Sequence, residues 1–237
     1  MKNVVITGST RGIGFGLAEA FLARGCKVVV SGRSQGSVDK AIETLSKSYP
    51  DASIGGVPCD VSKREDVELL WSQSRSFLGS VDIWINNAGI GHSPVAIWEL
   101  TSEQTNAVID VDLMGVIYGS QVAMNGMLEQ GSGHIYNMEG FGSDGKTQFG
   151  MGVYGAAKSA VRYFTKSLIK EAKDSPVKVG TLSPGIVITD FLTTMYKDEP
   201  ERFEKAKPIF NILGDEASTV TPWLASKVLS NESSGKS

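Results

Sequence analysis

Tyr154 and Lys158 are the two residues whose types and spacing most clearly indicate acid–base chemistry. They are four positions apart in a segment where Ala157, Val161 and Phe164 recur at helical spacing, so both side chains are expected on one face of a helix. A tyrosine phenol has an ordinary pKa of about 10, and a nearby ammonium group favours the phenolate and lowers that pKa. The pair therefore predicts a tyrosine that exchanges a proton with a bound molecule, although the same spacing also occurs by chance in many helices.

A glycine-rich loop follows the first apolar run, residues 4–6, and precedes a helical pattern that includes Leu17 and Phe21. Backbone N–H groups at a helix N-terminus are unpaired and carry positive partial charge, which favours phosphate, and glycines let a pyrophosphate approach the backbone. The spacing G-x-x-x-G-x-G differs from the common G-x-G-x-x-G pattern, but the physical argument is the same. A tight turn without a ligand is the alternative. The residues predicted to bind a dinucleotide here are Gly8, Ser9, Thr10, Arg11, Gly12, Ile13 and Gly14.

The end of the second predicted strand, residues 27–31, indicates which dinucleotide binds. An acidic residue there would hydrogen-bond the adenosine ribose 2′-hydroxyl group, but the sequence has Arg33 instead. Arg33 and Arg11 together suit a 2′-phosphate, because guanidinium groups form charge-assisted hydrogen bonds with phosphate oxygens. This favours NADP(H) over NAD(H), with two solvated surface arginines as the alternative. Asp60 and Val61, which end the third strand, either meet the adenine edge or belong to a turn.

Strand and helix patterns alternate along the whole chain. This alternation predicts a single α/β domain over residues 1–237, with a doubly wound parallel sheet of six to seven strands flanked by helices. Ligands of such sheets bind beyond the carboxyl ends of the strands. Two capping boxes are expected at helix starts, Ser62 with Glu65 and Thr101 with Gln104. The strands are expected over residues 1–7, 27–31, 54–59, 81–85, 134–137 and 177–182.

Two further motifs complete a recognisable set, Asn-Asn-Ala-Gly at 86–89 and Pro-Gly at 184–185. With the glycine loop and the Tyr154–Lys158 pair, they resemble the short-chain dehydrogenase/reductase family over nearly the whole chain. The resemblance implies a Rossmann-type sheet, hydride transfer between a nicotinamide cofactor and a carbonyl or alcohol, Tyr154 as proton donor with Lys158 as its partner, and a homodimer or homotetramer. Thr189 is implied to contact the nicotinamide carboxamide. The cofactor-binding residues outside the glycine loop are Asn87, Ala88, Gly89, Tyr154, Lys158, Pro184, Gly185, Val187 and Thr189.

The sequence departs from the family pattern at two positions. Where the family has the second serine of an Asn-x-Ser-Ser stretch, which positions the substrate oxygen, this chain has Gly140. Ser143 follows, and it either supplies the missing hydroxyl group or lies in a surface turn. Asp112 replaces a central-helix asparagine that shapes a water site for a proton relay, although a backbone carbonyl there can still hold the water. These departures motivate an alternative function, a catalytically weakened NADP(H)-binding regulator or scaffold, whereas Tyr154 and Lys158 favour an enzyme.

The stretch at 137–143 also resembles a subgroup of the family, the chlorophyll(ide) b reductases, which reduce a formyl group with NADPH. The resemblance implies an aldehyde-reducing role without fixing the substrate. Residues 191–214 mix aromatic, methionine and charged residues, so either a lid over a large apolar substrate or ordinary helix packing fits them. Family members continue past a glycine resembling Gly235 into a last edge strand. We expect that strand to be absent here and the tail from residue 230 to be disordered.

The composition limits the remaining possibilities. A net charge of −3 implies no general attraction to nucleic acid. The two histidines, His92 and His134, and the two cysteines form no metal-ligating pattern. His92 either borders the substrate or, as the favoured interpretation, is a solvated loop residue. We find no apolar run of membrane-spanning length and no targeting segment, which predicts a cytoplasmic location, or the plastid stroma if a transit peptide has been removed.

Overall fold

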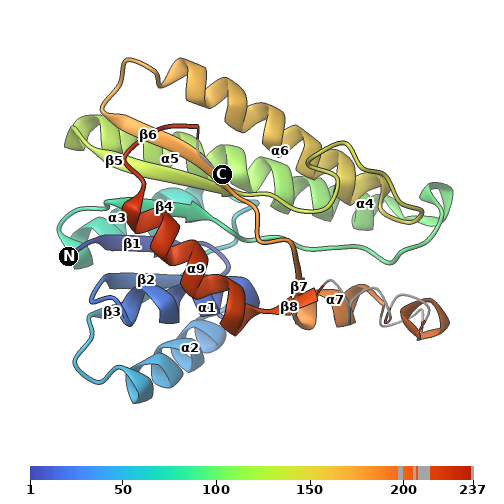
Figure 1. Cartoon of the computed structure of the whole chain (residues 1–237), viewed down its shortest axis with the longest axis horizontal. Coiled ribbons are helices and arrows are strands. Elements are labelled where there is room, and N and C mark those ends of the chain that lie inside the picture. Colours follow the sequence, from blue (N-terminus) through green and yellow to red (C-terminus); the bar gives the residue numbers. More distant parts are fainter. Residues whose placement is uncertain (197–199, 205–206, 208–213, 236–237) are drawn as a thin grey trace.

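Parallel strands form the central sheet of the computed structural model, which describes residues 1–196, 200–204, 207 and 214–235 (Figure 1). These strands are β1 (Asn3–Ile6), β2 (Lys27–Gly32), β3 (Ile54–Pro58), β4 (Ile83–Asn86), β5 (Gly133–Met138) and β6 (Val177–Leu182). Their order is β3-β2-β1-β4-β5-β6, so the winding direction reverses between β1 and β4. The predicted doubly wound sheet is confirmed, with six strands in the described part of the chain. Ligands of such sheets bind beyond the carboxyl ends at this reversal point.

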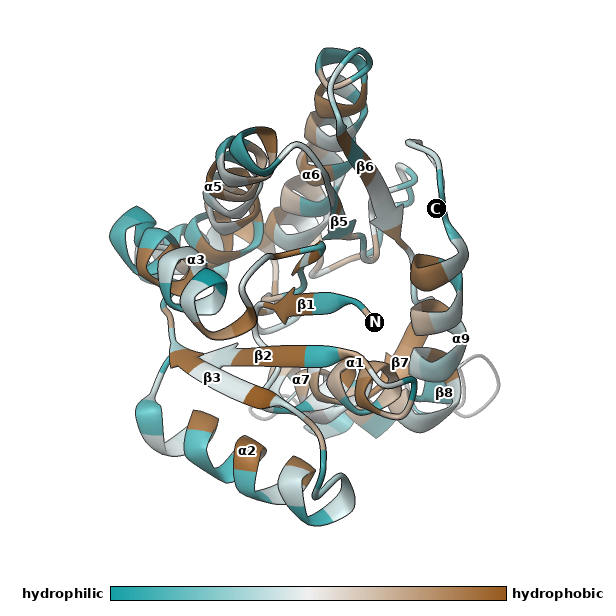
Figure 2. Ribbon diagram, turned by 90° about the vertical axis from the view of Figure 1, so that its left-hand side faces the viewer, coloured by the Kyte–Doolittle hydropathy of each residue, from teal (hydrophilic) through white to brown (hydrophobic). Residues whose placement is uncertain are grey.

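Helices cover both faces of the sheet (Figure 2). One face packs against α1 (Gly12–Leu22), α2 (Gln35–Ser48) and α9 (Ala217–Ser230). The other face packs against α3 (Arg64–Leu78), α5 (Gly115–Gln130) and α6 (Gly152–Glu171). This arrangement buries both faces of the strands, as expected for an all-parallel sheet.

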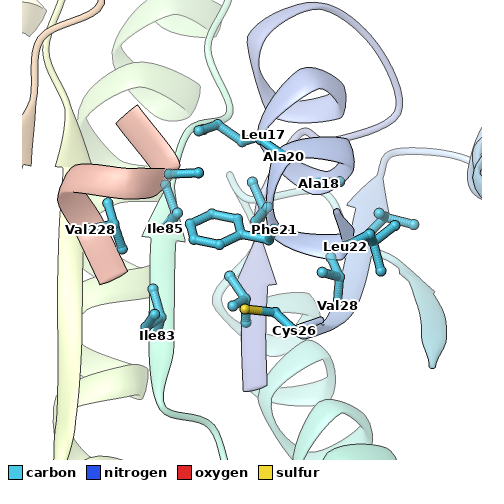
Figure 3. Close-up of a cluster of buried hydrophobic side chains, with 14 of the residues drawn as sticks. Leu17, Ala18, Ala20, Phe21, Leu22, Cys26, Val28, Ile83, Ile85 and Val228 are labelled. Carbon is cyan, nitrogen blue, oxygen red and sulfur yellow. The ribbon is translucent and has the colours of Figure 1, made fainter. Parts of the chain in front are cut away.

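Alternating side chains of the strands build the two halves of the core. In β1, Val4 packs toward α1 and α9, whereas Val5 packs toward α3 and α5. Because successive side chains of a strand point to opposite faces, a continuous apolar run fills both halves. Figure 3 shows Phe21 of α1 lying beside Ile85 of β4, with Val228 of α9 next to them. The apolar packing fixes α1, and therefore the glycine loop that leads into it, against the sheet.

One of the two predicted helix caps is confirmed and the other is wrong. Thr101 and Gln104 form the expected capping box at α4 (Ser102–Ile109): the Gln104 N–H donates to Thr101 Oγ1 (3.2 Å) and the Thr101 N–H donates to Gln104 Oε1 (3.0 Å). At α3 the N-cap is Lys63, whose side chain makes no capping bond. Ser62 instead donates its hydroxyl to Asp60 Oδ1 (2.7 Å), because the preceding turn offers a nearer acceptor.

The longest apolar helical run corrects a second expectation. Residues Ser102–Gln130 form 29 consecutive helical residues that are long and apolar enough, by length and composition, to cross a membrane. The expectation that no run reaches this length was therefore wrong. The run consists of α4, a π-helical turn (Asp110–Met114) and α5. Because α5 packs against α3, β4 and β5, the run lies in the fold as a core helix does.

A second, two-stranded parallel sheet was not predicted. It pairs β7 (Ile186–Ile188) with β8 (Gly214–Glu216), and α7 (Asp190–Met195) follows β7 (Figure 1). Residues 197–199, 205–206 and 208–213 of the predicted lid, 191–214, lie outside the described residues. The lid as a whole therefore stays a prediction.

The last described residues lie along the edge strand β6. The Gly235 N–H donates to the Val179 carbonyl (2.9 Å), and the Val179 N–H donates to Ser234 Oγ (3.2 Å). The expectation of a disordered tail was therefore wrong as far as residue 235, because backbone and hydroxyl groups of the tail pair with the sheet edge. Residues 236–237 lie outside the described part.

Candidate active site

The glycine loop between β1 and α1 packs directly against the loop that follows β4. Gly8 has a φ of 62°, and an ideal β-carbon on it would lie 2.7 Å from the Cα atom of Ala88. A β-carbon on Gly14 would meet the side-chain amide of Asn87. Packing alone therefore requires these two glycines, since a side chain at either position would push the loops apart.

The N-terminus of α1 begins at this glycine loop and has no side-chain cap. Arg11 is the N-cap residue, and its side chain makes no capping hydrogen bond. Gly12 has a φ of 59°, and the Thr189 methyl group lies 3.6 Å from the position of its missing β-carbon. A helix N-terminus behind a glycine loop, with N–H groups left for a ligand, fits a phosphate group. Ile13, in the first turn, is partly buried against the core on the side of α1 and α9.

Ser9 and Thr10 join the glycine loop to β2. Ser9 is fully buried, and its hydroxyl donates to the Ile6 carbonyl (2.7 Å) and accepts from the Ser31 N–H (2.9 Å). Thr10 packs against Gly32, whose missing β-carbon would lie 3.1 Å from Thr10 Oγ1. The hydroxyl of Ser9, a predicted cofactor ligand, is therefore already used to hold the backbone of the loop.

The contact between Thr10 and Gly32 brings two arginines to one edge of the sheet. Arg11 directly follows Thr10, and Arg33 directly follows Gly32. Both arginines are exposed, and neither forms an ion pair with any residue that the structure describes. The residues that precede the two arginines are thus in contact, and neither guanidinium group is paired with a carboxylate in the described part of the chain.

Asp60 and Val61 are engaged in protein contacts at the end of β3. Asp60 Oδ1 accepts from the Ser62 N–H (3.1 Å) and from its hydroxyl (2.7 Å), so the turn interpretation describes its contacts. Val61 is buried, and the missing β-carbon of Gly115 would lie 2.7 Å from its Cγ2 atom. An additional contact with adenine stays a prediction.

Thr7 and Asn87 hold the ends of β1 and β4 together. Thr7 Oγ1 accepts from the N–H groups of Asn87 (2.9 Å) and Ala88 (3.0 Å), and the Asn87 side chain donates to the carbonyls of Thr7 (2.9 Å) and Gly8 (3.1 Å). The Asn87 side chain therefore ties the ends of these two neighbouring strands together. Gly89 comes next, and its missing β-carbon would lie 3.0 Å from Asp112 Oδ2.

Asp112, Tyr154 and Lys158 form a buried cluster beside Gly89. Asp112 Oδ2 lies 3.0 Å from Lys158 Nζ, and Asp112 Oδ1 accepts from the Ile90 N–H (2.7 Å). Lys158 Nζ lies 5.6 Å from the centre of the Tyr154 ring, so the two side chains share one face of α6, as predicted. Asp112 sits in the π-helical turn, where the extra residue changes the direction of the side chains, and such turns are frequent at functional sites. The substitution of the family's asparagine thus creates a direct ion pair with Lys158.

The charges of this cluster oppose one another at Tyr154. Burial raises the pKa of Tyr154 above its ordinary value, the Lys158 ammonium lowers it, and the Asp112 carboxylate raises it. Burial also acts to lower the pKa of Lys158, but Asp112, and then Tyr154, outweigh it and leave that pKa raised. The Lys158 ammonium lowers the pKa of the phenol as expected, but burial, the largest influence, and Asp112 outweigh it, so the pKa of Tyr154 is raised overall. Tyr154 is therefore a protonated phenol at neutral pH, next to an ammonium held by Asp112.

Gly140 lies directly under the phenol. An ideal β-carbon on Gly140 would be 2.5 Å from Tyr154 Oη and 3.3 Å from Lys158 Cε. Such a contact is closer than real β-carbons make, so a serine at this position would require Tyr154 to shift. The phenol of Tyr154 can therefore occupy its position because residue 140 has no side chain.

Ser143 is buried rather than part of a surface turn. Its hydroxyl accepts from the Gly140 N–H (3.1 Å) and donates to the Lys158 carbonyl (3.3 Å). The single hydroxyl hydrogen is thus used to tie the loop after β5 to α6. These contacts favour a positioning role, and a direct contact with a substrate oxygen stays a prediction.

His92 was the main functional candidate that sequence reasoning undervalued. The favoured interpretation, a solvated loop residue, was wrong, because the side chain is only 5% exposed. Its Nδ1 atom lies 2.8 Å from the Ser93 carbonyl, and its Nε2 atom lies 3.3 Å from the backbone nitrogen of Tyr154. No sequence signal links residue 92 to the start of a helix sixty positions later, since only the folded sheet brings them together.

A cavity of about 200 Å³ lies beside His92, between the loop after β4, α4 and α7. Phe191 at the start of α7 packs against Tyr154 with the two rings tilted by 51° and 5.7 Å between their centres. Met195 packs against Gly91, whose missing β-carbon would lie 2.5 Å from Met195 Cγ. The first part of the predicted lid therefore lies over the phenol and lines this cavity.

The loop after β6 approaches the glycine loop from the other side. Pro184 and Gly185 (φ 75°) lead into β7, where Val187 is buried. The chain then reaches Thr189, which lies against Gly12. The structure thus brings this predicted cofactor segment to the N-terminus of α1.

The family model described as short chain dehydrogenase matches residues 2–200 of the chain. The chain belongs to the short-chain dehydrogenase family. The match runs from β1 through α7, so it includes the glycine loop, the Asp112–Lys158 pair and Tyr154. The family resemblance predicted from the four motifs is confirmed.

Several curated proteins are similar in sequence to this short-chain dehydrogenase. A protein of Arabidopsis thaliana named probable chlorophyll(ide) b reductase NYC1, chloroplastic, is 38% identical, over 99% of this chain and 49% of the relative. Chlorophyll(ide) b reductase NOL, chloroplastic, of the same plant is 37% identical, over 98% of this chain and 67% of the relative. A 3alpha-hydroxysteroid dehydrogenase of Mediterraneibacter gnavus is 36% identical, over 82% of this chain and 77% of the relative. The chain thus spans about half the length of the first of these relatives, and the predicted similarity to chlorophyll(ide) b reductases is confirmed.

Solved structures share the fold over almost the whole chain. Levodione reductase superposes with a TM-score of 0.88 at 25% identity, covering 99% of this chain and 94% of that structure. The closed form of a serine dehydrogenase, solved in complex with NADP⁺, superposes with a TM-score of 0.82 at 26% identity, covering 93% and 87%. The doubly wound sheet and its flanking helices are therefore those of this oxidoreductase family.

A buried hydrogen-bond network below the cluster was not predicted from the sequence. Asn86 at the end of β4 donates to Asn137 of β5 (2.8 Å) and to Ser120 of α5 (3.1 Å), and Asn137 donates to Thr165 of α6 (2.9 Å). The network connects β4 and β5 to two helices. One is α5, which follows the turn that carries Asp112, and the other is α6, which carries Tyr154 and Lys158. Because its members are fully paired, it rigidifies the base of the site.

Proposed function

We propose that this short-chain dehydrogenase is an NADP(H)-dependent reductase that converts a carbonyl group, an aldehyde, to an alcohol. The observation that carries the proposal is the cluster of Asp112, Tyr154 and Lys158, buried at the carboxyl ends of β4 and β5 beside the glycine loop. A protonated phenol held next to an ammonium is the arrangement that a proton donor to a carbonyl oxygen requires.

We propose that the glycine loop, the loop after β4 and the loop after β6 would together hold the cofactor. The uncapped start of α1 leaves backbone N–H groups for the pyrophosphate, and Gly8 and Gly14 let the glycine loop pack against the loop after β4. Arg11 and Arg33 suit a 2′-phosphate, which supports NADP(H) over NAD(H). A bound reduced nicotinamide supplies the hydride for the carbonyl carbon. We propose that Asp60, Asn87, Pro184 and Thr189, with their predicted neighbours, complete the site.

Each residue of the cluster has a different role in the transfer of the proton to the substrate. Tyr154 donates its phenol proton to the carbonyl oxygen as the carbonyl carbon gains the hydride, so the products are an alcohol and the oxidised cofactor. Lys158 stabilises the phenolate that remains and would hold a hydroxyl of the nicotinamide ribose when the cofactor is bound. Asp112 keeps Lys158 protonated through the 3.0 Å ion pair and holds it toward the loop after β4.

The substrate class is proposed from the relatives and from the surroundings of Tyr154. Two relatives are named chlorophyll(ide) b reductases, which supports a formyl group on a large apolar molecule. Phe191 and Met195 line the approach to the phenol, and both suit apolar contacts. The same relatives are named chloroplastic, which supports the plastid stroma as a location, with the cytoplasm as the alternative.

We also propose a homodimer or homotetramer. Leu128 of α5 is 44% exposed and Tyr163 of α6 is 79% exposed. These two helices lie on the same face of the sheet, so a partner surface there would cover apolar side chains of both.

NADPH oxidation with a panel of aldehydes and ketones, including a formyl-bearing chlorin, tests the proposed function. Replacing Tyr154 by phenylalanine should lower kcat about 10²- to 10⁴-fold while leaving NADPH binding unchanged, because only the proton donor is removed. Tyr163→Phe is the matched control, since Tyr163 is an exposed tyrosine on the same helix. Turnover that survives Tyr154→Phe would refute the assignment of the proton donor.

The alternative function is an NADP(H)-binding regulator or scaffold with weak chemistry. The observation that favours it is the replacement of the substrate-positioning serine by Gly140, together with a Ser143 hydroxyl that is bonded to backbone groups. NADPH binding without turnover of any carbonyl in the panel would support this alternative over the reductase.

A further inference from the structure

The backbone of Tyr154 is held by a side chain from another part of the chain. Tyr154 is the third residue of α6, so its N–H is one of the first four that have no intrahelical acceptor. The N-cap residue, Met151, makes no side-chain capping bond. The Nε2 atom of His92, in the loop after β4, lies 3.3 Å from the Tyr154 nitrogen and accepts a hydrogen bond from its N–H.

The two contacts of His92 fix one form of the imidazole ring. The Ser93 carbonyl can only accept a hydrogen bond, so Nδ1, 2.8 Å away, carries a hydrogen. In the neutral ring Nε2 is then an acceptor, which matches the Tyr154 N–H. Since the ring is 5% exposed, water has little access to replace either bond.

The loop after β4 thereby contacts both ends of the proton-donating cluster. Ile90 donates its N–H to Asp112, and His92, two residues later, accepts from Tyr154. Gly91 between them has no room for a β-carbon, because Met195 packs against it. This short loop therefore sets the distance between the helix that carries Asp112 and the helix that carries Tyr154 and Lys158.

We propose that His92 is a positioning residue of the reductase: its neutral ring holds the first turn of α6, and with it the phenol of Tyr154, against the loop after β4. The inference rests on the proposed function for its effect on turnover, but the hydrogen bond itself is independent of that function. Removing the bond should loosen the start of α6 and misplace the phenol, and misplacement by about 1 Å lowers turnover roughly a hundredfold.

Two substitutions of His92 distinguish its contact with Tyr154 from its contact with Ser93. His92→Gln keeps a carbonyl oxygen near the position of Nε2, so the Tyr154 N–H retains an acceptor. His92→Asn is shorter and reaches only the position of Nδ1, so that acceptor is lost. His134→Gln is the control, because His134 is the other histidine and lies at the start of β5, at the opposite end of the sheet.

The deciding measurement is hydrogen exchange at the Tyr154 amide, followed by NMR in the cofactor-free protein. We expect exchange about tenfold faster in His92→Asn, and near-wild-type exchange in His92→Gln and His134→Gln. Unchanged exchange in His92→Asn, with the thermal transition retained, would overturn the proposal. If His92→Asn does not fold, His92→Ala replaces it as the variant without an acceptor for the Tyr154 N–H, and exchange in His92→Ala that is no faster than in His134→Gln would overturn the proposal.

Turnover of NADPH with 4-nitrobenzaldehyde as the probe separates this inference from the proposed function. His92→Asn should lower kcat and leave the KM for NADPH unchanged, His92→Gln should restore most of kcat, and neither should lower the residual rate of Tyr154→Phe. If Tyr154→Phe abolishes turnover and His92→Asn does not change it, the positioning role fails alone. If Tyr154→Phe leaves turnover intact, the proposed function fails, and the amide exchange still decides whether His92 holds α6.

Discussion

Two groups of charged side chains, at opposite ends of the proposed site, differ in how the protein holds them. At the end that we call the catalytic end, Asp112 and Lys158 are buried and paired at 3.0 Å, with side chains 0% and 4% exposed. At the end that we call the arginine end, Arg11 and Arg33 are exposed, and no described residue forms an ion pair with either. The catalytic end is fixed by contacts within the protein, whereas the described residues leave the charges of the arginine end open to a ligand.

This difference follows from what each end is proposed to do. A proton donor must be positioned before the reaction, so its neighbours are buried and cross-linked, at the cost of desolvating two charges. A group that recognises a phosphate gains most when it stays solvated until the anion arrives, because its charge then remains available. Changes at the catalytic end should therefore affect stability, and changes at the arginine end should affect ligand choice.

Replacement of Lys158 by methionine should produce the largest loss of stability. The substitution leaves the Asp112 carboxylate buried without its cation, which costs about 3–5 kcal/mol of unfolding free energy. Urea unfolding measures the loss, and Lys166→Met, an exposed lysine of the same helix, should stay within about 0.5 kcal/mol of the wild type. The double variant Asp112→Asn with Lys158→Met should regain stability relative to Lys158→Met alone. Equal stability of these two variants would show that the ion pair is not what holds the catalytic end.

Replacement of Arg33 by alanine should change ligand choice and leave stability unchanged. Loss of a charge-assisted contact with a 2′-phosphate should weaken NADPH binding about tenfold to a hundredfold, with NADH binding unaffected. Fluorescence titration of both cofactors measures the effect, which should shrink as the salt concentration rises. Lys40→Ala, an exposed cation in α2, is the control. Parallel weakening of NADPH and NADH would contradict the role assigned to the arginine end.

Replacement of Gly140 by serine tests whether the catalytic end tolerates the residue usual in the family. The added β-carbon would lie 2.5 Å from Tyr154 Oη, so overpacking should cost about 1–3 kcal/mol and lower turnover rather than raise it. Gly36→Ser in α2 is the control, since nothing lies within 4 Å of that missing β-carbon. Increased turnover in Gly140→Ser would mean that the phenol has another position available.

The parts that sequence reasoning predicted are those whose signals are local. The strand–helix alternation and the four-residue spacing of Tyr154 and Lys158 depend on a few neighbouring positions, and the structure confirms both. Asp112 was interpreted as a departure from the asparagine of the family, with a backbone carbonyl there still able to hold the relay water. Its direct pairing with Lys158 depends on a π-helical turn, which no spacing in the sequence reveals.

The parts that were missed or wrong depend on which of several possible partners a polar side chain contacts. Ser62 matched a capping box, but Asp60 offered its hydroxyl a nearer acceptor. His92 sits in a polar loop, and only the fold places its ring at the backbone of Tyr154. Polar residues have several possible partners, so the sequence alone does not determine which contact forms.

The pH dependence of single-turnover NADPH oxidation, with the aldehyde of the panel that turns over fastest, tests the central claim most directly. Reduction requires protonated Tyr154, so the rate should be highest below the pKa of Tyr154 and fall as the pH rises through it. Burial and Asp112 raise that pKa, so Asp112→Asn should move the fall to lower pH, and Asp110→Asn, an exposed neighbour in the same turn, should not. A fall at the same pH in all three proteins would contradict the claim that the phenol of Tyr154, under the influence of Asp112, is the proton donor.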